Sequence, residues 1–218
     1  MSSSSYWETR YKSGGTSGSG SLGKLKDWKW SVIKKYAGEI DSIIDVGCGD
    51  LSFWEERVLP DNYIGIDISE TIVERNRSKW TRVFIHASAD EYVELPRARI
   101  VLCLDVLFHL MDDKLYAGTL RNLTRYSSTW IFVYTWTDNP FESWKMRLSL
   151  AGANATRGRI VGALRQISDK STDGLYEKYR NFPDYFNTFE QSGFFLKTQE
   201  REETNRFGAM YIFERKNG

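Results

Sequence analysis

Short runs of apolar and β-branched residues alternate along the chain with amphipathic segments at helical spacing. The apolar runs predict strands, in order at residues 42–46, 63–67, 82–86, 100–104, 130–135, 193–197 and 210–213. Between them, the apolar spacing predicts helices over about 68–80 and about 114–124. Strands that alternate with helices are typical of a parallel sheet with helices on both faces. We therefore predict an α/β fold with a seven-stranded, mostly parallel sheet and an antiparallel edge strand.

Three segments precede the first predicted strand. Residues 6–11 are expected to form a short amphipathic turn, and the Gly- and Ser-rich run over 13–23 predicts a flexible or ligand-shaped loop. Apolar residues at helical spacing over 28–36 then predict a helix that ends near Gly38. After the first strand, a glycine turn should lead into a second helix that includes residues 53–54.

The length of 218 residues fits a single domain. Within it we expect an N-terminal lid and helix over 1–38, a core over 39–136, an insertion over 137–191 and C-terminal strands over 192–218. The 30 basic and 29 acidic residues leave a net charge of +1, which argues against a general electrostatic attraction to nucleic acid. We expect no membrane span and, since no secretory signal or disulfide framework is evident, a cytoplasmic location.

The chemistry-bearing residues follow the first and second strands. In an open α/β sheet, ligands bind where the strand order reverses, which we expect after the first strand. Gly47 and Gly49 stand there and allow the backbone to approach a ligand closely. Asp67 ends the second strand, where a carboxylate can accept hydrogen bonds from both ribose hydroxyls of a nucleotide cofactor. An ordinary turn and a helix cap are the alternative interpretation.

Three segments resemble the first, second and fourth motifs of class I S-adenosylmethionine (SAM)-dependent methyltransferases: 45–50 (DVGCGD), 65–69 (GIDIS) and 103–110 (CLDVLFHL). This resemblance covers about residues 42–134. It implies the Rossmann-like class I fold, with SAM as cofactor and S-adenosylhomocysteine (SAH) as product. By the same resemblance, Asp67 would bind the ribose and Ile68 the adenine, and Asp45, Gly47 and Gly49 would surround the methionine part. Cys48 and Leu104 are also expected to be cofactor-binding residues.

Two further segments extend the resemblance. After the third strand, either Ser88 or Asp90 is expected to face the adenine amine, with Ala89 supplying backbone contacts. Near the N-terminus, Trp7, Arg10 and Tyr11 resemble the W-x-x-R-Y/W opening of some class I methyltransferases, including thiopurine-type enzymes. The resemblance implies that Arg10 binds the SAM carboxylate and that the two aromatic rings line the pocket beside the sulfonium.

The fourth motif carries the candidate catalytic residues. It resembles the VLEHL text of many small-molecule methyltransferases, with Phe108 in place of the acid. Because the chain has only two histidines, we expect no metal. His109 is the first candidate for a general base and Asp105 the next. A structural or indirect role for His109 and a capping or substrate-orienting role for Asp105 are the alternatives.

The acceptor is less defined by the sequence. The VLFHL text and the many aromatic residues favour methyl transfer to a hydroxyl of a small molecule or glycan precursor, by in-line displacement. The insertion lies where the resemblance implies a substrate cover, and its cations suggest a phosphate- or carboxylate-bearing acceptor: Lys145, Arg147, Arg157, Arg159, Arg165, Lys170, Lys178 and Arg180. The alternatives are an RNA or protein methyltransferase that docks through this segment, and a non-catalytic SAM-binding regulator. An NAD-dependent oxidoreductase is disfavoured by Ser52, which stands in place of a third glycine.

Overall fold

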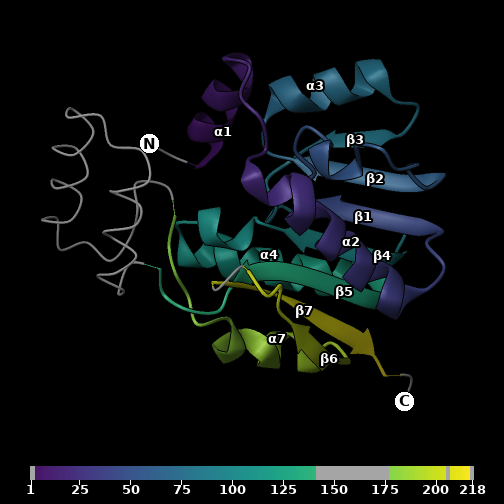
Figure 1. The fold of residues 1–218 in the computed structure, drawn as a ribbon, viewed down its shortest axis with the longest axis vertical. Coiled ribbons are helices and arrows are strands. Elements are labelled where there is room, and N and C mark those ends of the chain that lie inside the picture. The colour runs from purple at the N-terminus through teal and green to yellow at the C-terminus, as the bar shows by residue number, and fades with distance from the viewer. Residues whose placement is uncertain (1–2, 141–176, 205–206, 217–218) are drawn as a thin grey trace, which may run out of the picture.

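The computed structural model describes residues 3–140, 177–204 and 207–216 (Figure 1). Seven strands form one sheet in the order β3-β2-β1-β4-β5-β7-β6. Their bounds are β1 Ser42–Val46, β2 Asn62–Asp67, β3 Val83–His86, β4 Ala98–Leu104, β5 Ser127–Trp136, β6 Phe194–Glu200 and β7 Gly208–Arg215. The first five strands pair in parallel, and β7 pairs antiparallel with both β5 and β6. The predicted mostly parallel seven-stranded sheet with an antiparallel edge is confirmed.

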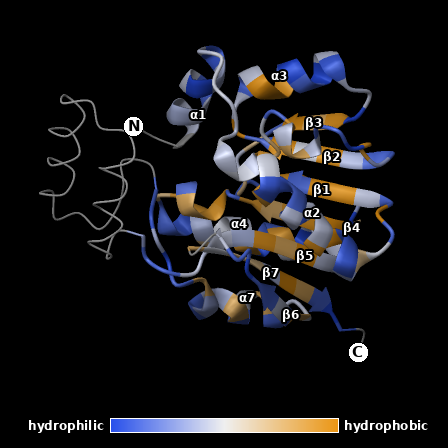
Figure 2. Cartoon of the chain, viewed as in Figure 1, coloured by the Kyte–Doolittle hydropathy of each residue, from blue (hydrophilic) through white to orange (hydrophobic). Residues whose placement is uncertain are grey.

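Side chains that alternate along the strands build an apolar core on each face of the sheet. Ile43 and Phe132 join one cluster, and their neighbours Ile44 and Ile131 join the other. Figure 2 shows the hydrophobic residues concentrated on the strands. Both faces are buried because helices cover both, as is usual for parallel sheets.

The α-helices divide between the two clusters. Residues of α2 (Gly23–Ala37) and α3 (Glu70–Lys79) pack into the first cluster, and those of α4 (Asp113–Tyr126) and α7 (Phe186–Glu190) into the second. The N-terminal helix α1 (Ser3–Lys12) lies beside α3, away from both clusters (Figure 1). Among the described residues, no helix has the length and apolar character needed to cross a membrane.

The prediction of a helix after Gly49 is wrong. The chain there forms only a single 3₁₀ turn, η2 (Ser52–Trp54). Leu51 and Glu56 have positive φ angles of 62° and 67°, so the backbone leaves helical geometry on both sides of the turn. Burial of Phe53 and Trp54 in the apolar core compensates for this conformation. No helix N-terminus therefore follows the glycine turn, and other groups must shape the site.

The N-terminal segments are more ordered than the sequence predicts. The expected turn over 6–11 is part of α1, and the Gly- and Ser-rich run contains a 3₁₀ turn, η1 (Ser19–Ser21), before α2 begins at Gly23. Residues 141–176, most of the predicted insertion, lie outside the described residues. The division into four segments stays a prediction.

Candidate functional site

A cavity lies at the carboxyl ends of β1, β2 and β4, where the strand order reverses. We call it the strand-end cavity. Most of the predicted cofactor residues line it, together with both candidate catalytic residues: Trp7, Tyr11, Asp45, Gly47, Cys48, Asp67, Ile68, Ser88, Ala89, Leu104, Asp105 and His109. The fold therefore brings together residues that lie far apart in the sequence, because the carboxyl ends of these strands meet where the strand order reverses.

Glycine is required at two positions of the turn that follows β1. Gly47 has a φ of 78°, and a Cβ atom there would lie 2.3 Å from Cγ2 of Val106. Gly49 has a φ of 56°, and its Cβ would lie 2.2 Å from Oγ of Ser17. Backbone N–H groups of residues 47 and 48 both donate to the Ile66 carbonyl, at 2.8 and 3.1 Å. The turn is thus fixed against β2, and Gly47 exposes backbone to the cavity.

Asp67 is buried at the end of β2 and is held by two backbone groups. Its Oδ2 accepts a hydrogen bond from the Gly49 N–H and its Oδ1 one from the Ser69 N–H, both at 2.9 Å. Desolvation raises the pKa of this carboxyl to about 6, although the two backbone hydrogen bonds oppose the shift. Each oxygen keeps a second lone pair for a ligand hydroxyl. Gly49 itself lies behind the carboxylate and does not line the cavity.

Asp45 is a second buried carboxylate on the same cavity. Its Oδ2 accepts hydrogen bonds from Trp54 Nε1 at 3.0 Å and from the Tyr63 hydroxyl at 2.9 Å. Burial raises the pKa of Asp45 to about 6, against the effect of these donors. The aromatic residues of η2 and β2 therefore hold Asp45 in place beside the glycine turn.

The structure separates the two candidates for the adenine contact. Ser88 lines the strand-end cavity and donates a hydrogen bond to Asp90. Asp90 lies outside the lining and packs toward α4, where a Cβ on Gly118 would come 2.8 Å from the Asp90 Cβ. Of the two, Ser88 is the residue placed to meet a ligand directly, with the Asp90 carboxylate behind it.

Helix α1 and the loop after it cover the cavity and are tied to the core by polar contacts. Glu8 accepts hydrogen bonds from the hydroxyls of Ser69 and Thr71, each at 2.6 Å, at the N-terminus of α3. These hydrogen bonds lower the pKa of Glu8 to about 2. Ser17 donates to both oxygens of Asp50, at 2.6 and 3.1 Å. We call the segment from α1 to η1 the N-terminal lid.

Arg10 differs from the expectation that it lies beside the strand-end cavity. It lines a second cavity, where its Nε donates to the Thr16 carbonyl at 2.6 Å. We call this the aromatic cavity, since rings from α1, η3 (Leu107–His109) and β5 line it: Tyr6, Trp7, Phe108, His109, Tyr134 and Trp136. Arg10 can meet a cofactor carboxylate only if the cofactor reaches this second cavity.

The two cavities share four lining residues, and two of them are the candidate catalytic residues. Trp7, Ser17, Asp105 and His109 line both. The His109 ring meets Trp7 edge to face, with ring centroids 5.0 Å apart and planes at 83°. The backbone N–H of His109 donates to the Val106 carbonyl at 2.9 Å, within η3. His109 thus stands between a site at the strand ends and a site among the aromatic rings.

Lys29 is a residue beside the site that the sequence pattern alone did not single out. Its side chain is completely buried, and its ammonium forms an ion pair with the Asp105 carboxylate and donates to the Gly20 carbonyl at 2.9 Å. The same ammonium lies 3.8 Å from the ring centroid of Tyr134. Burial lowers the pKa of Lys29, and the charge of Asp105 opposes that shift. A signal was present, because Lys29 precedes the apolar Val32 and Ile33 by three and four positions, on the buried face of α2.

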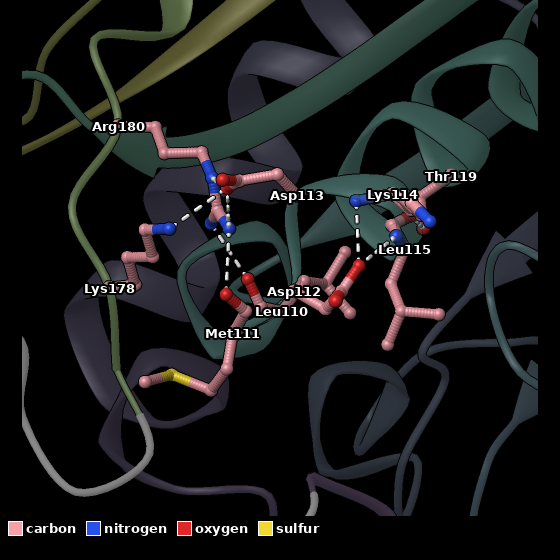
Figure 3. A network of polar contacts seen from close by, with 9 residues as sticks. All are labelled: Leu110, Met111, Asp112, Asp113, Lys114, Leu115, Thr119, Lys178 and Arg180. Atoms are coloured by element: carbon pink, nitrogen blue, oxygen red, sulfur yellow. Dashed lines mark hydrogen bonds and ion pairs between the residues drawn. The ribbon is translucent and has the colours of Figure 1, made fainter.

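The described end of the basic insertion is held by α4. Lys178 and Arg180 both contact Oδ1 of Asp113, at 2.9 and 2.7 Å, and Arg180 also donates to the carbonyls of Leu110 and Met111 (Figure 3). These two cations fasten the chain to the start of α4. The other six predicted cations lie outside the described residues. Within the described part, no group of three His, Cys, Asp or Glu side chains is placed to hold a metal ion.

No protein-family model matches the sequence, and no curated protein sequence matches it. Solved structures do. The magnesium protoporphyrin IX methyltransferase of Synechocystis PCC 6803 with bound SAH aligns over 97% of each chain, with a TM-score of 0.63 and 15% identity. The chain has the class I SAM-dependent methyltransferase fold.

Two more solved structures share this class I fold and are named for different substrates. The 1,6-didemethyltoxoflavin-N1-methyltransferase of Burkholderia thailandensis aligns over 99% of this chain and 87% of its own, with a TM-score of 0.61 and 10% identity. The sugar N-methyltransferase KedS8 of Streptoalloteichus sp ATCC 53650 aligns over 88% and 87%, with a TM-score of 0.59 and 13% identity. The fold is common to enzymes with unlike acceptors, so the acceptor must be argued from the site.

Proposed function

We propose that the protein is a SAM-dependent methyltransferase that transfers the methyl group to a hydroxyl of a small molecule or glycan precursor. The observation that carries this proposal is the pair of joined cavities. The strand-end cavity has the features of a nucleotide cofactor site, and it meets the aromatic cavity at Asp105 and His109. A methyl transferase needs such a junction, because donor and acceptor must meet in line.

The residues of the strand-end cavity fit SAM. Both oxygens of Asp67 retain a lone pair for the two ribose hydroxyls. Gly47 allows the turn to pass close to Val106, against which a Cβ would clash, and its backbone lines the cavity. Trp7 and Tyr11 offer stacked rings, 5.7 Å apart, beside which a positive sulfonium is tolerated. Ile68, Ser88 and Ala89 supply an apolar and hydroxyl-bearing wall for an adenine ring.

When bound, SAM supplies an electrophilic methyl group on a positively charged sulfur. The chain's own contribution is to orient the acceptor and to exclude water, since displacement at a methyl group requires alignment above all. His109 stands at the junction, where an imidazole nitrogen can take the proton of an acceptor hydroxyl. Asp105 is the second group at the junction, and its ion pair with Lys29 suits it to orient the acceptor more than to accept a proton.

Cofactor dependence and the role of His109 are tested together by turnover. The protein is incubated with SAM and a panel of small hydroxyl- and amine-bearing acceptors, and SAH is measured by mass spectrometry. We expect acceptor-dependent SAH formation that falls by about 100-fold in His109→Gln, in line with the usual contribution of a general base. SAH binding should be unchanged in that variant.

The alternatives give different outcomes in the same assay. Salt-sensitive turnover with an RNA or protein polymer, and none with small acceptors, would favour a polymer methyltransferase. SAM binding without turnover on either kind of acceptor would favour a SAM-binding regulator.

A further inference from the structure

The aromatic cavity has a surface of rings that the cofactor does not require. Phe108 of η3 and Trp136 of β5 stack face to face, with centroids 4.5 Å apart and planes at 6°. Both rings are only partly buried. Phe108 also occupies the position at which the resembling motif has an acid, so an aromatic ring replaces a charge in the wall of this cavity. Flat rings pack well against such a wall in stacked or edge-to-face geometry.

Among the described residues, two carboxylates and one guanidinium face this cavity. Asp105 and Glu177 both line it. The ammonium of Lys29 is buried behind Asp105, so a ligand meets the carboxylate and not the lysine. Arg10 lines the cavity too, but its guanidinium is bonded to the Thr16 carbonyl and the Tyr6 hydroxyl and lies 5.8 Å from the Trp7 ring centroid.

The cations that suggested an anionic acceptor do not reach this cavity where they are described. Lys178 and Arg180 bind Asp113 and the carbonyls at the start of α4 (Figure 3). Besides the Arg10 guanidinium, the described lining offers two carboxylates and several ring faces, which favour hydrogen-bond donors and positive charge over anions.

We propose that the acceptor is a flat aromatic small molecule that carries a hydroxyl and no negative charge. This inference rests on the proposed function and narrows its acceptor class. The ring lies against the wall of Phe108 and Trp136, and its donor group reaches Asp105 and His109 at the junction with the strand-end cavity. A sugar, which lacks a flat aromatic ring, and an anionic aromatic acid are both disfavoured.

The test compares four probes by calorimetry and saturation-transfer NMR, with SAH-saturated protein and again without SAH. Tyramine, tyrosol and 4-hydroxyphenylacetate share one phenol ring and differ in charge, and methyl β-D-glucoside represents a sugar. We expect tyramine and tyrosol to bind at least about tenfold more tightly than the other two probes. Tighter binding of the glucoside or of 4-hydroxyphenylacetate, or no binding of any probe, would overturn the acceptor class.

Variants locate the binding. Phe108→Ala and Trp136→Ala should each weaken tyrosol binding by about fivefold to tenfold, as expected for a lost ring contact. Trp80→Ala is the matched control, because Trp80 is 39% exposed and ends α3 away from both cavities, and it should change nothing. Glu177→Gln should reduce the difference in binding affinity between tyramine and 4-hydroxyphenylacetate, because it removes a negative charge from the cavity lining.

The outcomes separate the two proposals. Absence of SAH binding in folded protein defeats the proposed function, while the probe series without SAH still decides the preference of the cavity. SAH binding together with equal tyrosol binding by the wild type, Phe108→Ala and Trp136→Ala defeats only the acceptor class.

Discussion

The two cavities meet at Asp105 and His109, yet they are built in different ways. The strand-end cavity depends on backbone: a glycine turn fixed to β2, and two buried carboxylates at the ends of neighbouring strands. The aromatic cavity depends on side chains that come from α1, α2, η3 and β5. The fold itself thus determines the first cavity, whereas the second can change its ligand by substitution without a change of fold.

The largest expected effect on stability concerns the side chains beside the aromatic cavity. Lys29→Met leaves the Asp105 carboxylate without its buried partner and should lower the free energy of unfolding by about 3–5 kcal/mol. Lys34→Met, on the exposed face of the same helix, should stay within about 0.5 kcal/mol of the wild type. Chemical denaturation measures both. A loss below about 1 kcal/mol for Lys29→Met would mean that the ion pair does not support the junction.

Gly47→Ala tests the backbone turn of the strand-end cavity. The left-handed φ and the clash with Val106 should together lower the free energy of unfolding by about 2–4 kcal/mol and weaken SAH binding at least tenfold. Gly193→Ala is the control, since its φ of 81° is similar and its Cβ would meet only Arg215 Nη1 at 3.7 Å. That variant should lose only the conformational part, about 1–2 kcal/mol, and bind SAH normally. Equal SAH affinity in both variants would contradict the close approach of backbone to the ligand.

Ligand binding in the strand-end cavity should depend on pH. Ribose hydroxyls donate to an ionised carboxylate, and burial raises the pKa of Asp67 to about 6. SAH affinity should therefore be constant above about pH 7 and fall about tenfold per pH unit below 6. Asp45, which has a pKa raised to about 6 as well, titrates in the same range.

The sign of the stability change distinguishes this effect from acid unfolding. Because both carboxyls bind protons more readily in the folded protein than in the unfolded chain, their contribution to stability rises as the pH falls from 7 toward 4. SAH affinity measured by calorimetry between pH 5 and 8 should thus fall while the contribution of these two groups to stability grows. In Asp67→Asn the affinity should be low and nearly independent of pH. An unchanged pH profile in that variant would assign the titration to Asp45.

The smallest expected effect concerns the N-terminal lid that covers both cavities. Glu8→Gln weakens the charged hydrogen bonds to Ser69 and Thr71 and should speed SAH dissociation about fivefold, which corresponds to about 1 kcal/mol. Stopped-flow fluorescence measures the rate. Glu74→Gln, which removes only an exposed pair with Arg77, should leave the rate unchanged. The same rate of SAH dissociation in both variants would exclude a role for the Glu8 hydrogen bonds in holding the N-terminal lid closed.

The sequence predicted the strand-end cavity better than the aromatic cavity, for a physical reason. The first strand, the glycine turn and the acid that ends the second strand follow one another at short spacing, so residues 45–49 and Asp67 can be recognised as a motif. The partners of the aromatic cavity are far apart in the chain, and only the fold brings Lys29 to Asp105 or Phe108 to Trp136. The missing helix after Gly49 reflects two left-handed residues that no local pattern marks.

Calorimetric titration tests most directly whether the strand-end cavity binds SAM through Asp67. Wild type and Asp67→Ala are each titrated with SAM, SAH and NAD, after circular dichroism has established that both are folded. We predict micromolar binding of SAM and SAH to the wild type, a loss of about 100-fold in the variant, and no binding of NAD. Folded wild type that binds NAD, or that binds neither SAM nor SAH, would contradict the account.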